Sequence, residues 1–510
     1  MIAKVTSCGL MGVDGFVVDV EVDISNGLPS FEIVGLPDTA VRESKERVRA
    51  AIKNCNYEFP IKRITVNLAP AHIKKEGPCF DLPISIAILH ASEQIQVDDI
   101  KDYMLIGELS LNGELRPING VLPIAMAAYK NDIKKIIVPT QNAYEAAVVK
   151  GLEVYPANNL YQIILHLTGE KRIEPFAVDF DSLFSNTDRY GVDFSDVKGQ
   201  DNVKRALEVA AAGGHNCLMI GPPGAGKTMI AKRLPAILPD MTFEESLEVT
   251  KIHSIAGLMP QNMPLITTRP FRHPHHTISN ASLVGGGKVP KPGEISLAHY
   301  GVLFLDELPE FKKDVLEVMR QPLEDGQVTI ARVNATLTYP CECMLIASMN
   351  PCKCGFYGDN TKECTCTPLQ IQKYLGKVSG PLLDRLDIHV EVSPVRYKSL
   401  ESDETSESSS RIKDRVNRAR KIQIERYKGY NIFSNAQLQP SHMHKFCNLG
   451  DQEKNLLKMA FDRLGLSARA HNRILKVART IADLDESENI QSSHLAEAIQ
   501  YRSLDRKFWR

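Results

Sequence analysis

The residues best suited to do chemistry lie in a glycine-rich segment near the middle of the chain. Residues 221–228 read GPPGAGKT and match the pattern G-x-x-x-x-G-K-[ST] in full. An apolar stretch at 217–220 precedes them and a helical pattern at 229–234 follows, which is the context that a phosphate-binding loop requires. Glycines let backbone N–H groups approach phosphate oxygens, and the following helix N-terminus adds partial positive charge. We expect Lys227 to bridge the β- and γ-phosphates of a nucleotide and Thr228 to offer its hydroxyl to Mg²⁺.

Two carboxylates end a second apolar stretch. Residues 301–307 read GVLFLDE, so a buried strand is expected to deliver Asp306 and Glu307. In a phosphate-loop architecture Asp306 would hold Mg²⁺, and Glu307 would activate the attacking water as general base. A third apolar stretch, 344–348, leads to Asn350, whose amide either orients that water or begins a turn before a proline. The residues expected to hold the nucleotide are Gly221, Pro222, Pro223, Gly224, Ala225, Gly226, Lys227, Thr228 and Asp306.

Cysteines gather just after Asn350. The chain has eleven cysteines, and six of them lie between residues 341 and 366. Two C-x-C pairs within that segment offer four thiolates, enough to close a tetrahedral Zn²⁺ site. A one-residue spacer is less specific than C-x₂-C, so free thiols in a loop are the equal alternative. The candidate zinc ligands are Cys352, Cys354, Cys364 and Cys366. We expect Cys341 and Cys343 to pack in the core, and His273, His275 and His276 to make polar contacts in a loop more often than to bind a metal.

Composition limits the classes of function that need considering. The 510 residues carry 61 Lys and Arg against 62 Asp and Glu, a net charge of -1, which excludes a histone-like polycation. Any nucleic-acid contact must therefore come from a local patch. No basic region precedes the N-terminal stretch, and the longest apolar run, 83–89, falls far short of the ~20 residues that span a bilayer. We therefore expect a cytoplasmic protein with reduced cysteines.

The pattern along the chain predicts three blocks. Residues 1–170 mix strand-like alternation with helical periodicity, and 171–192 are mostly polar and read as a linker. Residues 193–400 alternate short apolar strands with longer amphipathic segments, which is typical of a parallel α/β sheet. Residues 401–410, ESDETSESSS, contain no apolar side chain and predict an exposed loop. Residues 411–510 follow the three-to-four spacing of helices.

These motifs resemble those of AAA+ ATPases related to the ATPase subunit of Mg-chelatase. The matching segments are GPPGAGKT, GVLFLDELPEF, ASMNPCKCG and SGPLLDRLDIHVEV. Two further segments, RPFRHPHHTIS and PGEISLAHYGVLFLDELPEF, are similar more narrowly to the YifB/ComM-type family, and the resemblance covers essentially the whole chain. It implies an α/β fold with an AAA+ P-loop core at 193–400 and a helical lid at 411–510.

The resemblance also implies roles for four residues. Asn350 matches the first sensor, and Arg385 matches the arginine finger, which acts on ATP held by a neighbouring subunit. Arg469 matches the second sensor, with Arg473 as the competing candidate; Glu307 is the base. Salt bridges of Arg385 to Asp384 or Asp387, and an exposed helix face for Arg469, are the structural alternatives. A trans arginine implies a ring, and the family expectation is a homo-hexamer.

The first block resembles the Lon protease domain, which has the ribosomal S5 domain 2-like α+β fold. The resemblance lies in KKEGPCFDLP at 74–83 and IGELSLNGELRPI at 106–118. Lon-type proteases use a Ser–Lys dyad. Here the nucleophile position is Cys79 and the lysine position falls on Leu122, which cannot activate a nucleophile. We therefore expect a Lon-like domain at 1–170 without peptidase activity, with Cys79 as an ordinary core or turn residue.

Three features could contact nucleic acid. Residues 327–332 and 335–338 predict a hairpin with Arg332 near its tip, which either touches a phosphate backbone or packs against a neighbour. Residues 411–426 carry seven Lys or Arg against two acids, although a solvated helix face is the commoner meaning. Lys288 and Lys291 lie beside glycines. The sequence contains no base-reading motif, so any DNA, single-stranded or branched, would be held by its backbone.

The resemblance implies an ATP-hydrolysing ring motor on DNA, a helicase that promotes branch migration in recombination or in the uptake of DNA. A chelatase-like ATPase that remodels a protein partner during metal insertion is the alternative, although the chain has no D-x-S-x-S motif. An ATP-dependent Lon-type protease is disfavoured by Leu122. A nucleotide-gated assembly protein without hydrolysis is disfavoured by the presence of Asp306, Glu307 and Arg385. The implied cofactors are ATP, Mg²⁺ and, at the cysteines, Zn²⁺.

Overall fold

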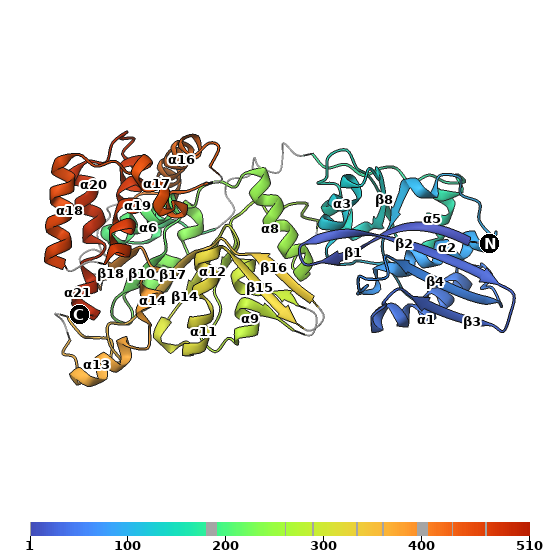
Figure 1. Cartoon of the computed structure of the whole chain (residues 1–510), viewed down its shortest axis with the longest axis horizontal. Coiled ribbons are helices and arrows are strands. Elements are labelled where there is room, and N and C mark those ends of the chain that lie inside the picture. The colour runs from blue at the N-terminus through green and yellow to red at the C-terminus, as the bar shows by residue number, and fades with distance from the viewer. Residues whose placement is uncertain are drawn as a thin grey trace. The chain divides into compact units, whose positions relative to one another are not determined.

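The computed structural model describes residues 2–179, 191–260, 262–287, 290–332, 335–359, 362–394, 406–430, 432–464 and 467–509. The chain divides into two compact units (Figure 1). The first unit consists of Met1–Asn186 and Phe243–Thr267, and the second unit of Thr187–Thr242 and Thr268–Arg510.

A seven-stranded mixed sheet forms the first unit, in the order β3-β4-β2-β1-β5-β8-β9. Its strands are β1 (Ile2–Met11), β2 (Asp14–Ser25), β3 (Ser30–Val34), β4 (Arg63–Ala69), β5 (Tyr103–Leu105), β8 (Lys135–Pro139) and β9 (Glu153–Ala157). The β1–β2 and β2–β4 pairs are antiparallel and the other pairs are parallel. Alternation builds one buried face, as in β4, where Ile64, Val66 and Leu68 are buried. A small hairpin of β6 (Glu108–Leu109) and β7 (Leu115–Arg116) lies outside the sheet.

Helices complete this unit, namely α1 (Thr39–Asn54), α2 (Asp81–Ala91), α3 (Val121–Lys130), α4 (Ala143–Ala146), α5 (Leu160–Leu167) and α8 (Phe243–Ala256). Asp38 caps α1 by accepting a hydrogen bond from Val41 N–H at 2.8 Å. Helix α2 is apolar on all sides, which suits its burial among the sheet and α1. The apolar run at 83–89 is therefore a core helix. In the described ranges, no helix is both long and apolar enough to cross a membrane.

Helix α8 packs with the first unit, although it lies within the segment that the sequence pattern assigns to the α/β block. Leu122, Val148 and Leu265 form a small buried cluster, against which Phe243 and Leu247 pack. A buried carboxylate adds a polar link, because Glu145 accepts hydrogen bonds from the Ser254 hydroxyl and, at 2.7 Å, from the backbone N–H of Leu122. Residues 243–267 thus belong to the first unit, whereas the residues on either side of them belong to the second.

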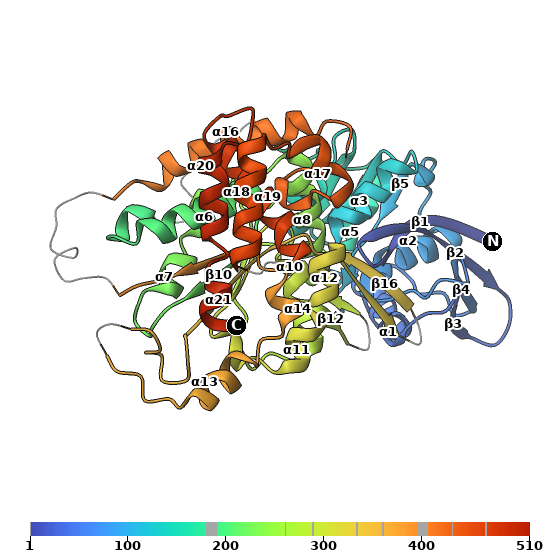
Figure 2. The same cartoon turned by 60° about the vertical axis from the view of Figure 1, so that its left-hand side comes forward.

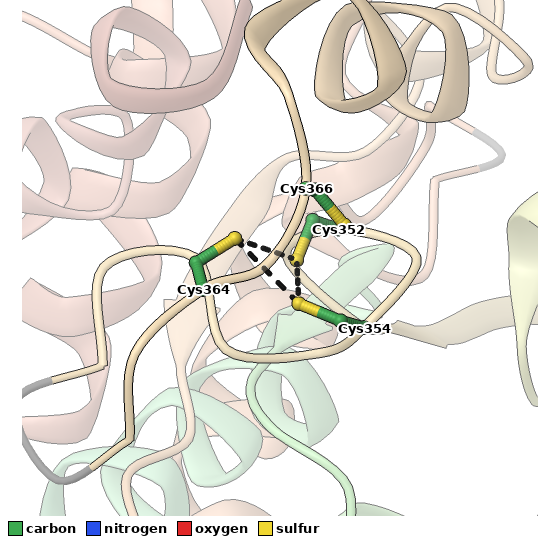
Figure 3. Close-up of side chains that lie close together, drawn as sticks. All are labelled: Cys352, Cys354, Cys364 and Cys366. Atoms are coloured by element: carbon green, nitrogen blue, oxygen red, sulfur yellow. Dashed lines mark hydrogen bonds between the residues drawn. The ribbon is translucent and has the colours of Figure 1, made fainter.

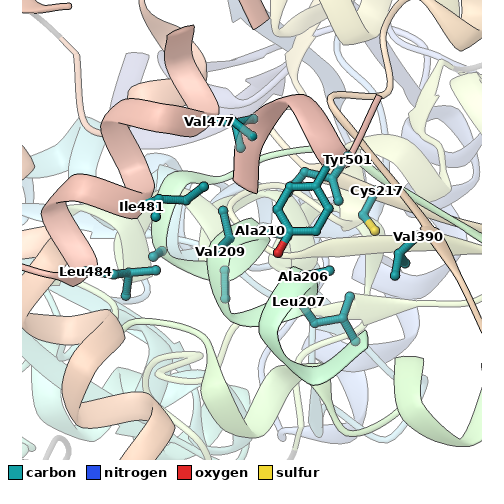
Figure 4. Close-up of a cluster of buried hydrophobic side chains, with 14 of the residues drawn as sticks. Ala206, Leu207, Val209, Ala210, Cys217, Val390, Val477, Ile481, Leu484 and Tyr501 are labelled. Atoms are coloured by element: carbon teal, nitrogen blue, oxygen red, sulfur yellow. The ribbon is translucent and has the colours of Figure 1, made fainter. Parts of the chain in front are cut away.

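The second unit is built on a parallel sheet of five strands in the order β11-β14-β17-β10-β18. The strands are β10 (Cys217–Ile220), β11 (Phe271–Arg272), β14 (Val302–Leu305), β17 (Met344–Met349) and β18 (Ile388–Glu391). Every residue of β10, β14 and β17 is buried, as in a sheet covered on both faces. Figure 4 shows α6 (Asp201–Gly213) with its Ala206 and Val209 in one apolar cluster with Val477 and Ile481.

Two antiparallel hairpins project from this unit. They pair β12 (Gly285–Gly286) with β13 (Lys291–Pro292), and β15 (Gln327–Arg332) with β16 (Ala335–Pro340). The second is the hairpin expected from the sequence. The short helices of this unit are α7 (Lys227–Ala231), α9 (Asn280–Val284), α10 (Glu294–Leu297), α11 (Lys313–Val318), α12 (Arg320–Asp325), α13 (Pro368–Leu375) and α14 (Gly380–Leu383).

The C-terminal part is helical, as its periodicity predicts. It contains α16 (Ser409–Arg426), α17 (Pro440–Phe446), α18 (Asp451–Leu464), α19 (Ala468–Leu484), α20 (Ser492–Gln500) and α21 (Leu504–Trp509). Helices α18, α19 and α20, drawn in red, lie side by side in both views (Figures 1 and 2).

The boundary before these helices differs from the exposed loop expected at 401–410. Residues 401–405 lie outside the described part, but Ser409 and Ser410 already belong to α16 and Ser409 is buried. The Ser409 hydroxyl accepts a hydrogen bond from Phe194 N–H at 2.8 Å, and its own N–H donates to Asp193 at 3.1 Å. Composition misled here because serines are as suited to a helix start as to a loop.

Candidate active site

The glycine-rich segment forms a tight loop between β10 and α7. Gly224 and Gly226 have φ of 78° and 85°, a conformation that L side chains rarely adopt. A Cβ on Gly221 would lie 2.2 Å from the Val392 carbonyl oxygen, so only glycine fits there. Helix α7 is shorter than the pattern at 229–234 suggests, because Pro235 cannot donate to the Ala231 carbonyl and the chain continues as a 3₁₀ turn.

Lys227 points into the loop. Its ammonium donates hydrogen bonds to the carbonyl oxygens of Gly221 at 2.7 Å and Pro222 at 2.9 Å, and to Asn350 Oδ1 at 3.1 Å. Burial lowers the pKa of Lys227, and the charges of Asp306 and Glu307 act in the opposite direction. A buried cation among oxygens is the arrangement that a phosphate would bind.

Asp306 joins the loop to the sheet. Thr228 Oγ1 donates to Asp306 Oδ2 at 2.5 Å, and Asp306 Oδ1 accepts from the Ser348 hydroxyl and from the Glu307 N–H at 3.0 Å. A hydroxyl and a carboxylate oxygen side by side suit Mg²⁺, which prefers hard oxygen ligands. Sequence reasoning missed Ser348. Its place in β17, the strand next to β14, is the signal that could have found it.

Glu307 lies at the edge of the site with an exposed side chain. It adopts a left-handed backbone conformation, with φ of 55°, at the turn that follows β14. A non-glycine residue there carries strain, which is common at functional sites. Its carboxylate lies 3.8 Å from His276 Nδ1. The described histidines form no candidate metal group, so His276 is better understood as a neighbour of Glu307.

Strand order explains why Lys227, Asp306, Glu307 and Asn350 meet. The strands β14, β17 and β10 are adjacent and parallel, so their carboxyl ends reach the same edge of the sheet. Crevices at that edge are where open α/β sheets bind ligands. The four residues follow these strand ends and form one site.

Arg385 lies at the opposite end of the strands, the end at which the parallel strands begin. It comes three residues before β18, and Asp387 N–H donates to the carbonyl of Asn216, which precedes β10. Four residues of extended strand, ~13 Å, separate this edge from the phosphate loop. The guanidinium of Arg385 donates to the carbonyls of Pro381 at 2.7 Å and Arg320 at 3.2 Å and pairs with the carboxylate of Glu324.

Arg469 is near Arg385 and away from the phosphate loop. It lies in α19 with a 70% exposed side chain, and its Nη1 is 3.4 Å from Asp384 Oδ2. Arg473, the competing candidate, is largely buried with its Nε 3.6 Å from Asp387. Of the residues predicted for the site, Arg385 and Arg469 are therefore the two that this chain does not bring to its own phosphate loop.

The basic stripe on α16 is largely engaged inside the protein. Lys413 pairs with Asp240, Arg415 with Glu208 and Glu407, Arg418 with Glu486, and Arg426 with Asp483, at distances of 2.5 to 2.9 Å. Arg420 donates to the carbonyls of Ala211 and Phe433. Four of the seven cations of the stripe thus form intramolecular ion pairs. Of the other basic candidates, Lys291 is exposed on β13, whereas Lys288 and the side chain of Arg332 lie outside the described residues.

The positions that match the Lon dyad hold no catalytic pair. Burial raises the pKa of the Cys79 thiol, and its sulfur lies 3.8 Å from the Cys8 carbonyl oxygen. Leu122 is a buried residue of α3. A thiol held protonated is a poor nucleophile.

The four candidate zinc ligands converge (Figure 3). All four sulfurs lie within 4.8 Å of one another, the only such group in the described part of the chain. The sulfur of Cys352 is 3.3 Å from that of Cys354 and 3.7 Å from that of Cys364, and the latter two are 3.5 Å apart. All eleven cysteines are unpaired. Cys341 is buried, with its sulfur 3.7 Å from the Pro322 carbonyl, and Cys343 is half-buried.

The chain also matches known families and proteins along its length. Residues 193–400 match the family described as magnesium chelatase, subunit ChlI, residues 20–142 match subunit ChlI of Mg-chelatase, and residues 406–502 match the ChlI C-terminal family. Competence protein ComM of Haemophilus influenzae is 44% identical over 508 residues, covering 99% of this chain and 98% of that protein. Uncharacterized protein YifB of Escherichia coli is 45% identical over 499 residues, covering 97% and 96%. Lon protease of Rhizobium meliloti is 24% identical over 177 residues, covering 32% of this chain and 22% of that protein.

The parallel sheet, the phosphate loop with its paired hydroxyl and carboxylate, and the matched families define a Mg-chelatase-like AAA+ ATPase. Within that class, the chain belongs to the YifB/ComM family.

Proposed function

We propose that this protein is a homo-hexameric ring motor that hydrolyses ATP in the cytoplasm and acts on DNA, promoting branch migration in recombination or DNA uptake. The observation that carries the proposal is the position of Arg385. This arginine lies at the opposite sheet edge from Lys227 of the same chain, so its service to catalysis requires a second copy. A repeated head-to-tail contact of that kind forms a ring when the rotation between neighbouring copies closes.

Each residue of the phosphate site has a distinct task. Lys227 would exchange its carbonyl partners for the β- and γ-phosphate oxygens of ATP, and Thr228 and Asp306 would hold Mg²⁺, which would supply positive charge at the phosphates. Glu307 takes a proton from the attacking water, and Asn350 orients that water from the next strand end. His276 lies beside the Glu307 carboxylate, at 3.8 Å. Ser348 and the Glu307 N–H fix the second oxygen of Asp306.

The two remaining arginines act on the neighbouring subunit in this proposal. Arg385 and Asp384 are consecutive, and Asp384 pairs with Arg469, so both arginines belong to one region of the second unit. Two guanidinium groups delivered together would neutralise the charge that develops on the transferred phosphate. The second sensor would then also work in trans, from the C-terminal helices that form the lid.

DNA enters the proposal through the relatives and the hairpin. A full-length relative carries the name competence protein, and the family resemblance implies branch migration. Because four of the seven α16 cations are paired internally, the β15–β16 hairpin is the better DNA contact, with Arg332 as its candidate. The second function worth testing is remodelling of a protein partner, which the ChlI family descriptions favour.

The test is ATP hydrolysis by the purified protein, alone and with single-stranded, duplex and forked DNA at moderate salt. We expect DNA to stimulate turnover, Lys227→Ala to lose ATP binding, and Glu307→Gln to bind ATP without hydrolysing it. Arg332→Ala should reduce the stimulation, whereas Arg418→Ala, which removes one exposed ion pair, should not. Turnover indifferent to every DNA would refute the DNA motor and direct the search to a protein partner.

A further inference from the structure

The four sulfurs of Cys352, Cys354, Cys364 and Cys366 have the spacing of a filled metal site. A tetrahedral Zn²⁺ ion with Zn–S bonds of about 2.3 Å places its ligand sulfurs about 3.8 Å apart. The three separations among Cys352, Cys354 and Cys364, 3.3, 3.5 and 3.7 Å, lie close to that value, and the sulfur of Cys366 is within 4.8 Å of the other three. They are far longer than a disulfide bond of about 2.05 Å. The cluster is therefore neither oxidised nor dispersed, but arranged for one ion.

The donor set selects the kind of ion and its role. Four thiolates favour soft or borderline cations such as Zn²⁺ over Mg²⁺ or Ca²⁺. With all four positions taken by protein, no place is left for water or substrate, so the ion would be structural. Cys352 is fully buried and the other three are half-buried. Lys353 and Lys362 in the same segment offset part of the negative charge of four thiolates.

The cluster is tied directly to the phosphate site. Cys352 comes two residues after Asn350, and Gly355 N–H donates to the Cys352 carbonyl at 3.1 Å, which closes a turn around the first thiol pair. Gly355 has φ of 88°, and a Cβ there would lie 2.4 Å from Pro223 Cδ. The turn that carries the first two sulfurs therefore rests on the phosphate loop itself.

The second thiol pair is tied to the same place. Cys366 is followed at once by Thr367, which caps α13. Burial raises the pKa of Tyr374 in that helix and the backbone N–H of Asn350 acts in the opposite direction, so the phenol lies near the start of the segment. The segment that begins at Asn350, after β17, thus comes back to Asn350 at Tyr374. The four sulfurs lie between these two residues in the sequence.

We propose that these four cysteines bind one Zn²⁺ ion, and that the ion forms a clasp that holds Asn350 and the phosphate loop in their ATP-binding geometry. The metal would restrict the backbone of this segment, which its glycines leave conformationally free. Without it, ATP would have to refix this segment on binding, and refixing the backbone of even one residue corresponds to about a tenfold loss of affinity. The clasp would act on ATP binding whether or not the protein works on DNA.

The first test is metal content of the full-length protein purified without chelator. We expect about one Zn²⁺ per chain, lost in Cys352→Ser/Cys364→Ser and retained in Cys343→Ser, a cysteine outside the cluster in the same unit. Substitution by Co²⁺ should give the visible bands of a tetrahedral thiolate site. Folded wild-type protein without zinc, or zinc retained in the double variant, would overturn the site.

The second test asks whether the bound zinc supports ATP binding, separately from whether zinc binds at all. Affinity for a fluorescent ATP analogue is measured before and after removal of zinc by a strong chelator, and after zinc is added back, with circular dichroism to follow folding. We expect a reversible loss of about tenfold or more. Gly355→Ala provides a variant that keeps all four ligands but pushes the turn off Pro223, and it should retain zinc and lose ATP affinity. Unchanged ATP affinity in both the zinc-free protein and Gly355→Ala would overturn the clasp, even if the metal site itself were real. These results do not depend on whether DNA stimulates turnover.

Discussion

Two inactive variants of this protein should restore each other's activity when they are mixed. Glu307→Gln removes the general base but leaves Arg385 intact, and Arg385→Ala does the reverse. If Arg385 completes the site of a neighbouring subunit, a mixed ring contains interfaces at which an intact Glu307 faces an intact Arg385. If both residues served one subunit, every site in the mixture would lack one of them.

The size of the effect follows from the contacts of Arg385. Its side chain is 16% exposed, donates to two carbonyls and pairs with Glu324, which is 65% exposed. Because Glu324 remains in contact with water after the change, Arg385→Ala leaves no buried charge unpaired. Arg385→Ala should therefore remain folded. A trans arginine contributes about 10³–10⁵ in rate, which is ~4–7 kcal/mol of transition-state stabilisation. The loss should fall on kcat, with ATP binding nearly unchanged.

The assay is steady-state ATP hydrolysis across mixing ratios of the two variants at fixed total protein. At equal amounts, random assembly leaves about one quarter of the head-to-tail interfaces with both intact residues, so activity should peak near that fraction of wild type. A mixture of Glu307→Gln with Lys227→Ala is the control, since both lesions lie in one site and no ratio should restore activity. Inactivity of the first mixture at every ratio, in rings shown by native mass spectrometry to contain both variants, would refute the trans assignment.

Two further predictions concern stability and the loop. Asp81 is fully buried and burial raises its pKa to about 6, although Arg47 donates to it at 2.6 and 3.0 Å. Between about pH 4 and 6 the folded state binds more protons than the unfolded state, so the contribution of Asp81 to the free energy of unfolding falls as pH rises. Arg47→Ala should lower the free energy of unfolding by about 3–5 kcal/mol near pH 8, where it leaves a buried charge unpaired, and by much less near pH 5. Urea unfolding at the two pH values checks this, and an equal cost at both would contradict it. Gly221→Ala should abolish ATP binding because its Cβ would lie 2.2 Å from the Val392 carbonyl oxygen, and normal binding in an equilibrium titration would refute that reading of the loop.

The sequence predicts the parts of the active site that are local. The glycine loop, the strand before it and the strand ending in Asp306 and Glu307 are all found where the pattern places them. Local spacing suffices there because apolar runs and glycines determine the backbone directly. The convergence of the cysteines is local in the same sense, since one turn at Gly355 and one return to Cys366 bring the pairs together.

Other features depend on contacts with residues that are distant in the sequence, and local sequence patterns do not reveal such contacts. Glu324, the acidic partner of Arg385, lies 61 residues away, whereas the sequence offered only Asp384 and Asp387. The cations of α16 form a basic stripe in the sequence, which could indicate a nucleic-acid contact. In the structure Asp240, Glu208 and Asp483 form ion pairs with three of them. Helix α8 buries Val249 and Ile252 together with polar side chains, and nothing in its sequence pattern indicates which of the two units it will join.

Sheet polarity joins these observations into one functional argument. In a parallel sheet, a residue after a strand and a residue before its neighbour lie at opposite edges. Lys227, Asp306 and Asn350 follow their strands, whereas Arg385 precedes β18, so no side-chain rearrangement within one chain joins them. Mutation of Arg385 should therefore impair the site of the adjacent subunit, and mutation of the cysteine cluster, which touches Pro223 of its own loop, should impair its own. In mixed rings of Arg385→Ala with the Cys352→Ser/Cys364→Ser variant, ATP hydrolysis at low ATP concentration should therefore come mainly from interfaces where an intact clasp faces an intact Arg385, whereas saturating ATP should restore the interfaces between two cysteine-variant subunits.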